Sequence, residues 1–254
     1  MRGGVDPSTA VTVSVASHGQ GALVAELLKH LVALDNADVV RVVVVHNLPA
    51  PDLVAPPAAR FELLQLHNEA PLGFAANHNL AFTRCCTPWF AVLNPDLDFS
   101  CGDPFPRLLE VAAADARLGA VAPVLLDPGT LTPAPARNLV TPMELVRRRL
   151  PGWAPPAQPQ WLVGAFVLLR ASAFRAVGGF DAGYRLYCED VDLGLRLQLA
   201  GWGVQRIEDA RVVHDKQQAS HRRLRYLWWH VAGLARLWTS PAFVRFLLRP
   251  LVRE

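Results

Sequence analysis

Two nucleotide-binding signatures are absent from this 254-residue chain. It has no G-x-G-x-x-G run, whose glycines bring a helix N-terminus close to a dinucleotide diphosphate, and no G-x-x-x-x-G-K-[ST] phosphate loop. A dinucleotide-dependent Rossmann enzyme is therefore excluded. No internal repeat is visible.

Cysteines and long apolar runs are also scarce. The four cysteines form no C-x-x-C pair, and the neighbours Cys85 and Cys86 are unsuited to an ordinary bridge. We therefore expect reduced thiols in a cytosolic protein. The segment Met1 to Pro7 lacks the apolar core of a signal peptide, and no apolar run approaches the ~18 residues of a membrane span. We expect a protein that is soluble or peripheral on a membrane.

Composition and charge distribution restrict the partners. A hydrophobic content of 52% with 19% charged residues excludes a disordered chain, and the length fits one large α/β domain or two small ones. The net charge of +3 does not indicate nucleic acid, and we expect no such partner. From His214 onward eight Lys/Arg and two Asp/Glu give +6, which leaves −3 for the remainder. A basic tail suggests phosphates or an anionic membrane surface, although a solvated arginine-rich helix explains the charge equally well.

Short β-branched runs alternate with helical stripes along the first part of the chain. A strand, a helix and a strand within about forty residues predict a right-handed βαβ unit. Predicted strands cover 11–16, 39–45, 61–66, 89–93, 120–125, 161–169, 204–207 and 210–213. Predicted helices cover 22–34, 104–116, 171–177 and 193–203, with a further amphipathic helix from Leu224.

Polar residues follow several of these strands. Ligands of open α/β sheets lie beyond the carboxyl ends of the strands, so Ser17-His18-Gly19 and His46-Asn47 should share one rim, although turn chemistry explains them too. The small residues of Leu72 to Asn79 would let a helix N-terminus approach a phosphate. Asn94-Pro95-Asp96 places a carboxylate, a ligand that Mg²⁺ and Mn²⁺ prefer, at another strand end; an Asx-Pro turn is the alternative.

A second acidic stretch, Tyr187 to Leu193, packs Glu189, Asp190 and Asp192 into four positions. Carboxylates this close repel one another when ionised, and a helix that begins at Glu189 would partly stabilise them through its dipole. A helix start and a functional acid cluster can both be true of this stretch. The proline-rich residues 127–159, with Arg147 to Arg149, are interpreted as an insertion or mobile loop over the site.

Seven motifs in order resemble the family-two glycosyltransferases with a GT-A fold, and most closely their rhamnosyltransferase-like branch. They are L-G-F-A-A-N-H-N, L-N-P-D, W-L-V-G-A-F-V-L-L-R, V-G-G-F-D, Y-C-E-D-V-D-L-G-L-R, A-G-W and A-R-V-V-H. The resemblance runs from about Val11 to His214. It implies one Rossmann-like α/β domain over 1–220, with a mixed, mainly parallel sheet covered by helices and 127–160 as a loop or insertion, followed by an amphipathic helical extension over 221–254.

The resemblance also implies chemistry: transfer from a nucleotide-diphosphate-sugar with inversion, aided by Mg²⁺ or Mn²⁺. Asp190 matches the general base with Glu189 beside it, and Asp96 with His214 matches the metal position. Acceptor contacts are expected at Trp161, Gly164 and Ala165. Donor contacts are expected at Ser17, His18, Gly19, His46, Asn47, Gly73, Phe74, His78, Asn79, Asn94 and Asp96.

Some positions depart from the family pattern. His46 stands where an aspartate commonly reads the nucleobase, and Ser17-His18-Gly19 replaces the commoner Asn-Tyr-Asn. No Q-x-x-R-W follows, so we expect transfer of one sugar, such as rhamnose, and no processive synthesis. The expected donor is dTDP- or UDP-linked and the acceptor a glycan or lipid-linked intermediate of the cell envelope. The C-terminal helices would contact the inner face of the membrane or a second subunit. A catalytically weak relative that binds a nucleotide sugar or glycan for a partner enzyme is the alternative.

Overall fold

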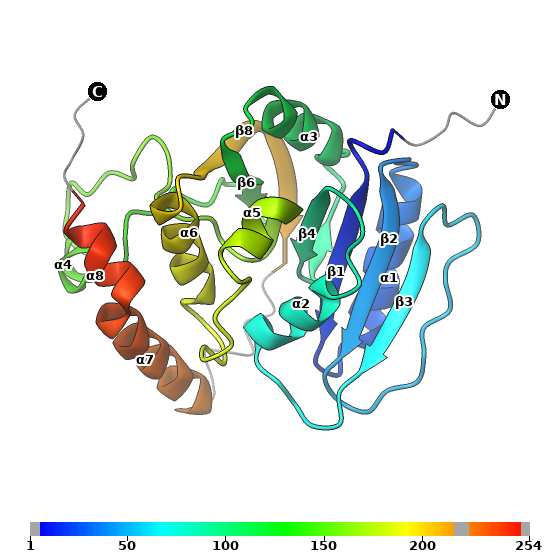
Figure 1. Cartoon of the computed structure of the whole chain (residues 1–254), viewed down its shortest axis with the longest axis horizontal. Coiled ribbons are helices and arrows are strands. Elements are labelled where there is room, and N and C mark those ends of the chain that lie inside the picture. Colours follow the sequence, from blue (N-terminus) through cyan, green and yellow to red (C-terminus); the bar gives the residue numbers. More distant parts are fainter. Residues whose placement is uncertain (1–5, 216–223, 250–254) are drawn as a thin grey trace.

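The computed structural model describes residues 6–215 and 224–249. Its centre is one eight-stranded sheet in the order β3-β2-β1-β4-β7-β6-β8-β5 (Figure 1). The strands are β1 (Val11–Ser17), β2 (Val39–His46), β3 (Glu62–His67), β4 (Trp89–Leu93), β5 (Leu97–Asp98), β6 (Leu118–Leu126), β7 (Phe166–Arg170) and β8 (Gly203–His214). The sheet is mixed, because β7 pairs antiparallel with β4 and β6, and β5 pairs antiparallel with β8.

The first four strands of the sheet order, β3, β2, β1 and β4, are parallel to one another. The chain builds outward from β1 to β2 and β3, then crosses to the other side of β1 to form β4. This reversal creates a topological switch point between β1 and β4, the place where open α/β sheets bind ligands. The expected mixed, mainly parallel α/β sheet is confirmed.

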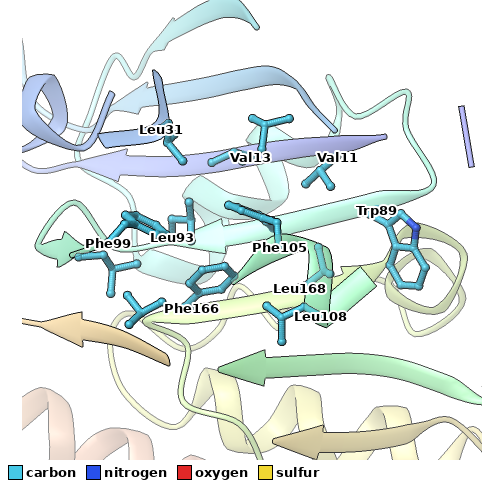
Figure 2. Close-up of a cluster of buried hydrophobic side chains, with 14 of the residues drawn as sticks. Val11, Val13, Leu31, Trp89, Leu93, Phe99, Phe105, Leu108, Phe166 and Leu168 are labelled. Carbon is cyan, nitrogen blue, oxygen red and sulfur yellow. The ribbon is translucent and has the colours of Figure 1, made fainter. Parts of the chain in front are cut away.

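Helices cover both faces of the sheet. The helices α1 (Gly21–Ala33) and α3 (Phe105–Ala114) pack against one face, where Val13, Leu31 and Phe166 belong to the large apolar cluster drawn in Figure 2. On the other face lie α2 (Phe74–Phe82), α5 (Ala171–Ala176) and α6 (Glu189–Leu199), around Phe90 and Phe174. Coverage of both faces explains why β2 is almost entirely valine.

The C-terminal helices α7 (Leu224–Thr239) and α8 (Pro241–Leu247) continue past the sheet and pack on α6. A third apolar cluster joins them: Leu237 of α7 and Phe243 of α8 meet Leu195 of α6 and Leu139 of the 127–159 segment. That segment also contains α4 (Pro142–Arg147). Thr141 caps the N-terminus of α4, because its Oγ1 accepts a hydrogen bond from Glu144 N. The sequence reasoning had not predicted this helix.

Three predicted strands and one predicted helix differ from the structure. The helix predicted over 193–203 is α6, which spans Glu189–Leu199, and Gly203 already belongs to β8. The strand predicted at Trp161 begins only at Phe166, because Trp161 turns away to donate its indole N–H to Asn138 O. The two strands predicted at 204–207 and 210–213 are one strand, β8, with an irregularity where its pairing to β6 shifts register. The domain boundary predicted at residues 220 and 221 lies outside the described residues.

Candidate active site

A cleft of about 240 Å³ lies at the switch point between β1 and β4. Residues that follow parallel strands line it: His18 after β1, Asn47 after β2, and Asn94 with Asp96 after β4. Phe74 and His78 of α2 form another part of its wall. Six residues predicted to bind the donor therefore share one cleft, as expected from the common edge of parallel strands.

Three asparagines hold the rim of this cleft together. Asn47 Nδ2 donates to Leu72 O at 2.9 Å, and Asn47 Oδ1 accepts from Leu72 N at 2.7 Å. Asn68 Nδ2 donates to Asn47 and to Asn77, whose own amide donates to Gly73 O. This network fixes the segment 72–73 and with it the N-terminus of α2.

His78 presents an unsatisfied nitrogen within the cleft wall. Its ring is 1% exposed; Nδ1 forms a 2.7 Å hydrogen bond with Ser14 Oγ, and Nε2 has no partner. Burial lowers the pKa of His78 to about 3, so the imidazole is neutral at physiological pH. A buried Nε2 without a partner is suited to a hydrogen bond with a ligand in the cleft.

Asp96 and His214 meet at the edge of the cleft. The antiparallel pairing of β5 with β8 puts Leu97 opposite His214, and Asp215 N donates to Asp96 O at 3.0 Å. His214 Nε2 and Asp96 Oδ1 are 3.2 Å apart, and both side chains are largely buried. Asp96 Oδ1 nevertheless accepts no hydrogen bond.

This geometry fits two ligands of one divalent ion. Neighbouring ligands of an octahedral ion at about 2.1 Å lie about 3 Å from each other. A carboxylate oxygen and an imidazole nitrogen match the preferences of Mn²⁺, with substrate phosphates and water completing the coordination. A second group, His46, Asp52 and His67, also brings potential ligand atoms together. Three of its atoms take part in hydrogen bonds, since His46 Nε2 contacts Gln65 Oε1 and His67 Nε2 contacts Asp52 Oδ1, whereas His46 Nδ1 is buried without a partner.

Glu189 and Asp190 open α6, which confirms the predicted helix start. Asp190 Oδ2 accepts a hydrogen bond from Gly164 N at 3.1 Å, and Oδ1 accepts from Val191 N at 2.9 Å. Glu189 is 5% exposed, and its Oε2 has no partner. Asp192 forms an ion pair with Arg196, four residues along the helix, at 2.7 Å.

Burial raises the pKa of both acids. Desolvation raises the pKa of Glu189 to about 8, with the charge of Asp190 as a second cause. Desolvation also raises the pKa of Asp190, while its backbone hydrogen bonds lower it. Asp190 is only partly buried and lies next to the cleft: Gly164 packs between Asp190 and the ring of Phe74, which lines the cleft.

The backbone before these acids is strained. Tyr187 and Cys188 have φ of 74° and 69°, in the left-handed region that costs side-chain-bearing residues about 1–2 kcal/mol each. Two glycines approach this loop closely. A Cβ on Gly73 would lie 2.6 Å from Arg185 O, and a Cβ on Gly233 of α7 would lie 2.8 Å from Tyr187 O. The acid loop, Arg185 to Cys188, is thus clamped between α2 and α7.

Several predicted site residues lie elsewhere. Ser17 is buried below the rim, and Asn79 exchanges two hydrogen bonds with the backbone of Phe180. Trp161 packs against Gly194 of α6, and Ala165 O accepts from Asn94 N at 2.8 Å. None of these four, nor Gly19, Gly73 or His46, lines the cleft within the described residues. Their proposed contacts with donor or acceptor stay predictions.

Other cleft residues were missed by the sequence reasoning: Gln20, Leu72, Asn77, Arg185, Tyr226 and Trp229. The guanidinium of Arg185 lies 5.2 Å from the ring centre of Trp229. Arg185 lies two residues before the acidic stretch that begins at Tyr187, and this position was an available signal. Tyr226 and Trp229 lie in the amphipathic helix predicted from Leu224, and their direction toward the cleft depends on the packing of α7.

Comparisons with known proteins fit this site. Residues 153–253 match the family model described as glycosyl transferase family group 2. The chain is 36% identical to the N-acetylglucosaminyl-diphospho-decaprenol L-rhamnosyltransferase of Mycobacterium tuberculosis over 155 residues. This alignment covers 53% of this chain and 49% of the relative. It is 48% identical over 54 residues to the rhamnosyltransferase WbbL of Escherichia coli, covering 21% of this chain and 20% of the relative. The chain thus spans about half or less of these relatives.

Solved structures show the same fold. The mannosyltransferase PcManGT from Pyrobaculum calidifontis, in complex with GDP-Man and Mn²⁺, superposes with a TM-score of 0.61 at 19% identity, over 96% of this chain and 70% of that one. S. aureus TarS 1–349 with UDP-GlcNAc gives 0.63 at 14% identity, over 94% and 71%. The fold is GT-A, and the resemblance to family-two glycosyltransferases, rhamnosyltransferase-like branch, is confirmed.

The raised pKa of Glu189 predicts a pH-dependent stability. Between about pH 4.5 and 8 the folded state keeps a proton that the unfolded state has lost, so stability falls as pH rises through this window. The slope should reach up to about 1.4 kcal/mol per pH unit. In urea unfolding, the free energy of unfolding of Glu189→Gln should decline less steeply with pH than that of wild type. The exposed Glu69→Gln should keep the wild-type slope, and a Glu189→Gln slope equal to wild type would refute the prediction.

Gly233→Ala tests the clamp on the acid loop. The new methyl group would meet Tyr187 O, so the loop or α7 must shift. We expect a loss of about 1–3 kcal/mol of stability and a larger fall in activity than that stability loss explains. Ala232→Ser, at an exposed position of the same helix, is the matched control. Unchanged kinetics in folded Gly233→Ala would show that the contact does not position the acids.

Proposed function

We propose that this protein is an inverting glycosyltransferase that moves a single sugar from a nucleotide-diphosphate-sugar to a hydroxyl of a lipid-linked or other cell-envelope glycan. The observation that carries the proposal is the pairing of His214 with Asp96, which lines the switch-point cleft. Asp190 lies behind the cleft wall, across Gly164 from the ring of Phe74. The partial match to rhamnosyltransferases favours rhamnose as the sugar and a dTDP- or UDP-linked donor.

The donor would occupy the cleft. The neutral His78 Nε2 and the amide of Asn94 offer hydrogen bonds there, and Arg185 supplies the positive charge that a diphosphate requires. A divalent ion held by Asp96 and His214 would stabilise the negative charge of the leaving diphosphate. The arginines at 147–149 sit on α4 and its C-terminus, and no described contact links them to the cleft.

Asp190 would act as the general base. Its carboxylate is oriented by two backbone N–H groups, so it can accept the proton of an acceptor hydroxyl as that oxygen attacks the anomeric carbon. The pKa of Asp190 is raised by burial, which brings its basicity closer to the working pH. Desolvation and the charge of Asp190 raise the pKa of the neighbouring Glu189 to about 8, which limits the negative charge around the base.

Turnover of UDP-, dTDP- and GDP-sugars with and without Mn²⁺ tests the proposal. Asp190→Asn should lower kcat by at least about a hundredfold with little change in donor affinity, because a base acts in the transition state. Asp96→Asn should abolish a Mn²⁺-dependent thermal shift with the donor. Asp98→Asn is the matched control, since Asp98 Oδ1 only accepts from Ser100 N.

The same measurements can refute the proposal. Donor binding without hydrolysis or transfer, equal in wild type and Asp190→Asn, would leave a nucleotide-sugar-binding protein. A thermal shift that is independent of Mn²⁺ for every donor would exclude the metal at Asp96 and His214.

A further inference from the structure

The helices α4, α7 and α8 lie at one end of the molecule, away from β2 and β3 (Figure 1). On α7 and α8, six large apolar side chains are exposed: Leu227, Trp228, Val231, Val244, Leu247 and Leu248. Trp228 is 69% exposed, although burial of an indole is strongly favourable. Each helix shows these residues at i, i+3 or i+4 spacing, which forms one stripe on its outer side.

The helix α4 extends the same surface. Met143, Val146 and Leu150 of α4 and the following turn are all more than half exposed. Trp238 Nε1 of α7 donates to Val140 O at 2.7 Å, just before α4. Burial and the charge of Arg148 lower the pKa of His230 on α7. We refer to the exposed residues of these three helices as the α4–α7–α8 surface.

Arginines are interspersed among the apolar side chains. Arg147, Arg148 and Arg245 are exposed and form no ion pair with any carboxylate in the part of the chain that the structure describes. Arg149 and Arg249 donate only to backbone carbonyls of Leu145 and Gln198. The nearest acid of α4, Glu144, is engaged by Asn138 and Trp153.

We propose that the α4–α7–α8 surface docks on an anionic lipid bilayer, with its apolar side chains at the level of the head groups. The mixture of exposed Trp and Leu with unpaired Arg matches the chemistry of a helix that lies in an anionic interface. A second copy of the chain fits less well, because a two-fold interface places each patch opposite itself and brings arginine against arginine. Among the described helices, none is long and apolar enough to cross a membrane.

The position of α7 gives this docking a consequence for the reaction. Leu227, Trp228 and Val231 point outward, whereas Tyr226 and Trp229 on the same helix line the cleft. Docking would therefore hold the cleft beside the head groups, where the sugar of a lipid-linked acceptor is found. This part rests on the proposed function; the docking itself does not.

Sedimentation of the full chain with vesicles tests the docking without donor or acceptor. Wild type should bind phosphatidylcholine vesicles that contain phosphatidylglycerol, bind pure phosphatidylcholine vesicles at least tenfold more weakly, and lose affinity with added salt. Trp228→Glu with Leu247→Glu should bind the anionic vesicles at least tenfold more weakly than wild type. Val54→Glu, at a 90% exposed residue between β2 and β3, should match wild type.

Three results would overturn the proposal. The first is that wild type does not bind the anionic vesicles. The second is that Val54→Glu loses as much vesicle affinity as the double variant. The third is that light scattering finds wild type as a dimer and the double variant as a monomer. Circular dichroism and thermal unfolding confirm that the variants fold. In the double variant, transfer to a water-soluble acceptor should be unchanged and transfer to a vesicle-borne acceptor should be reduced. If wild type transfers sugar to neither acceptor, the proposed function is refuted and the docking result stays intact.

Discussion

The structure depends on the close backbone contact at the acid loop, which joins three parts of the chain that are distant in sequence. Gly73 at the start of α2 and Gly233 in α7 leave no room for a side chain against Arg185 and Tyr187. Phe74 N donates to Arg185 O at 3.0 Å, which fixes the same contact. The clamp holds Tyr187 and Cys188 in left-handed conformations that an isolated peptide would avoid. The favourable packing of α6, α7 and α8 offsets this strain.

The clamp explains why the two acids carry perturbed pKa values. The turn at Cys188 begins α6 with Glu189 and Asp190 directed inward, so both carboxylates lose solvation. Asp190 recovers part of that loss through the N–H groups of Gly164 and Val191. Strain and desolvation at one loop are typical of sites where geometry is needed for chemistry.

The cleft and the α4–α7–α8 surface share one helix. Helix α7 supplies Gly233 to the clamp, Trp229 to the cleft and Trp228 to the outer surface. A change in the position of α7 would therefore alter all three of these regions. The C-terminal helices therefore complete the site, although the motifs of the resemblance end at His214. The family model agrees, since its match continues from 153 to 253.

The sequence by itself determined the α/β class, most of the strands along the chain and the loops that follow them. Alternating valine runs and helical stripes are local patterns, and residues that follow parallel strands must share an edge, so His18, Asn47 and Asn94 could be grouped in advance. It could not show that Trp161 turns away from β7, or that residues 203–214 form one strand, because both depend on long-range pairing. Only the tertiary structure decided that Asn79 forms hydrogen bonds with the backbone of Phe180, and that Arg185, Tyr226 and Trp229 face the cleft. The physical reason is that the direction of a side chain is set by what packs against its element, and helix α7 finds its partners far upstream, at Tyr187 for Gly233 and at Val140 for Trp238.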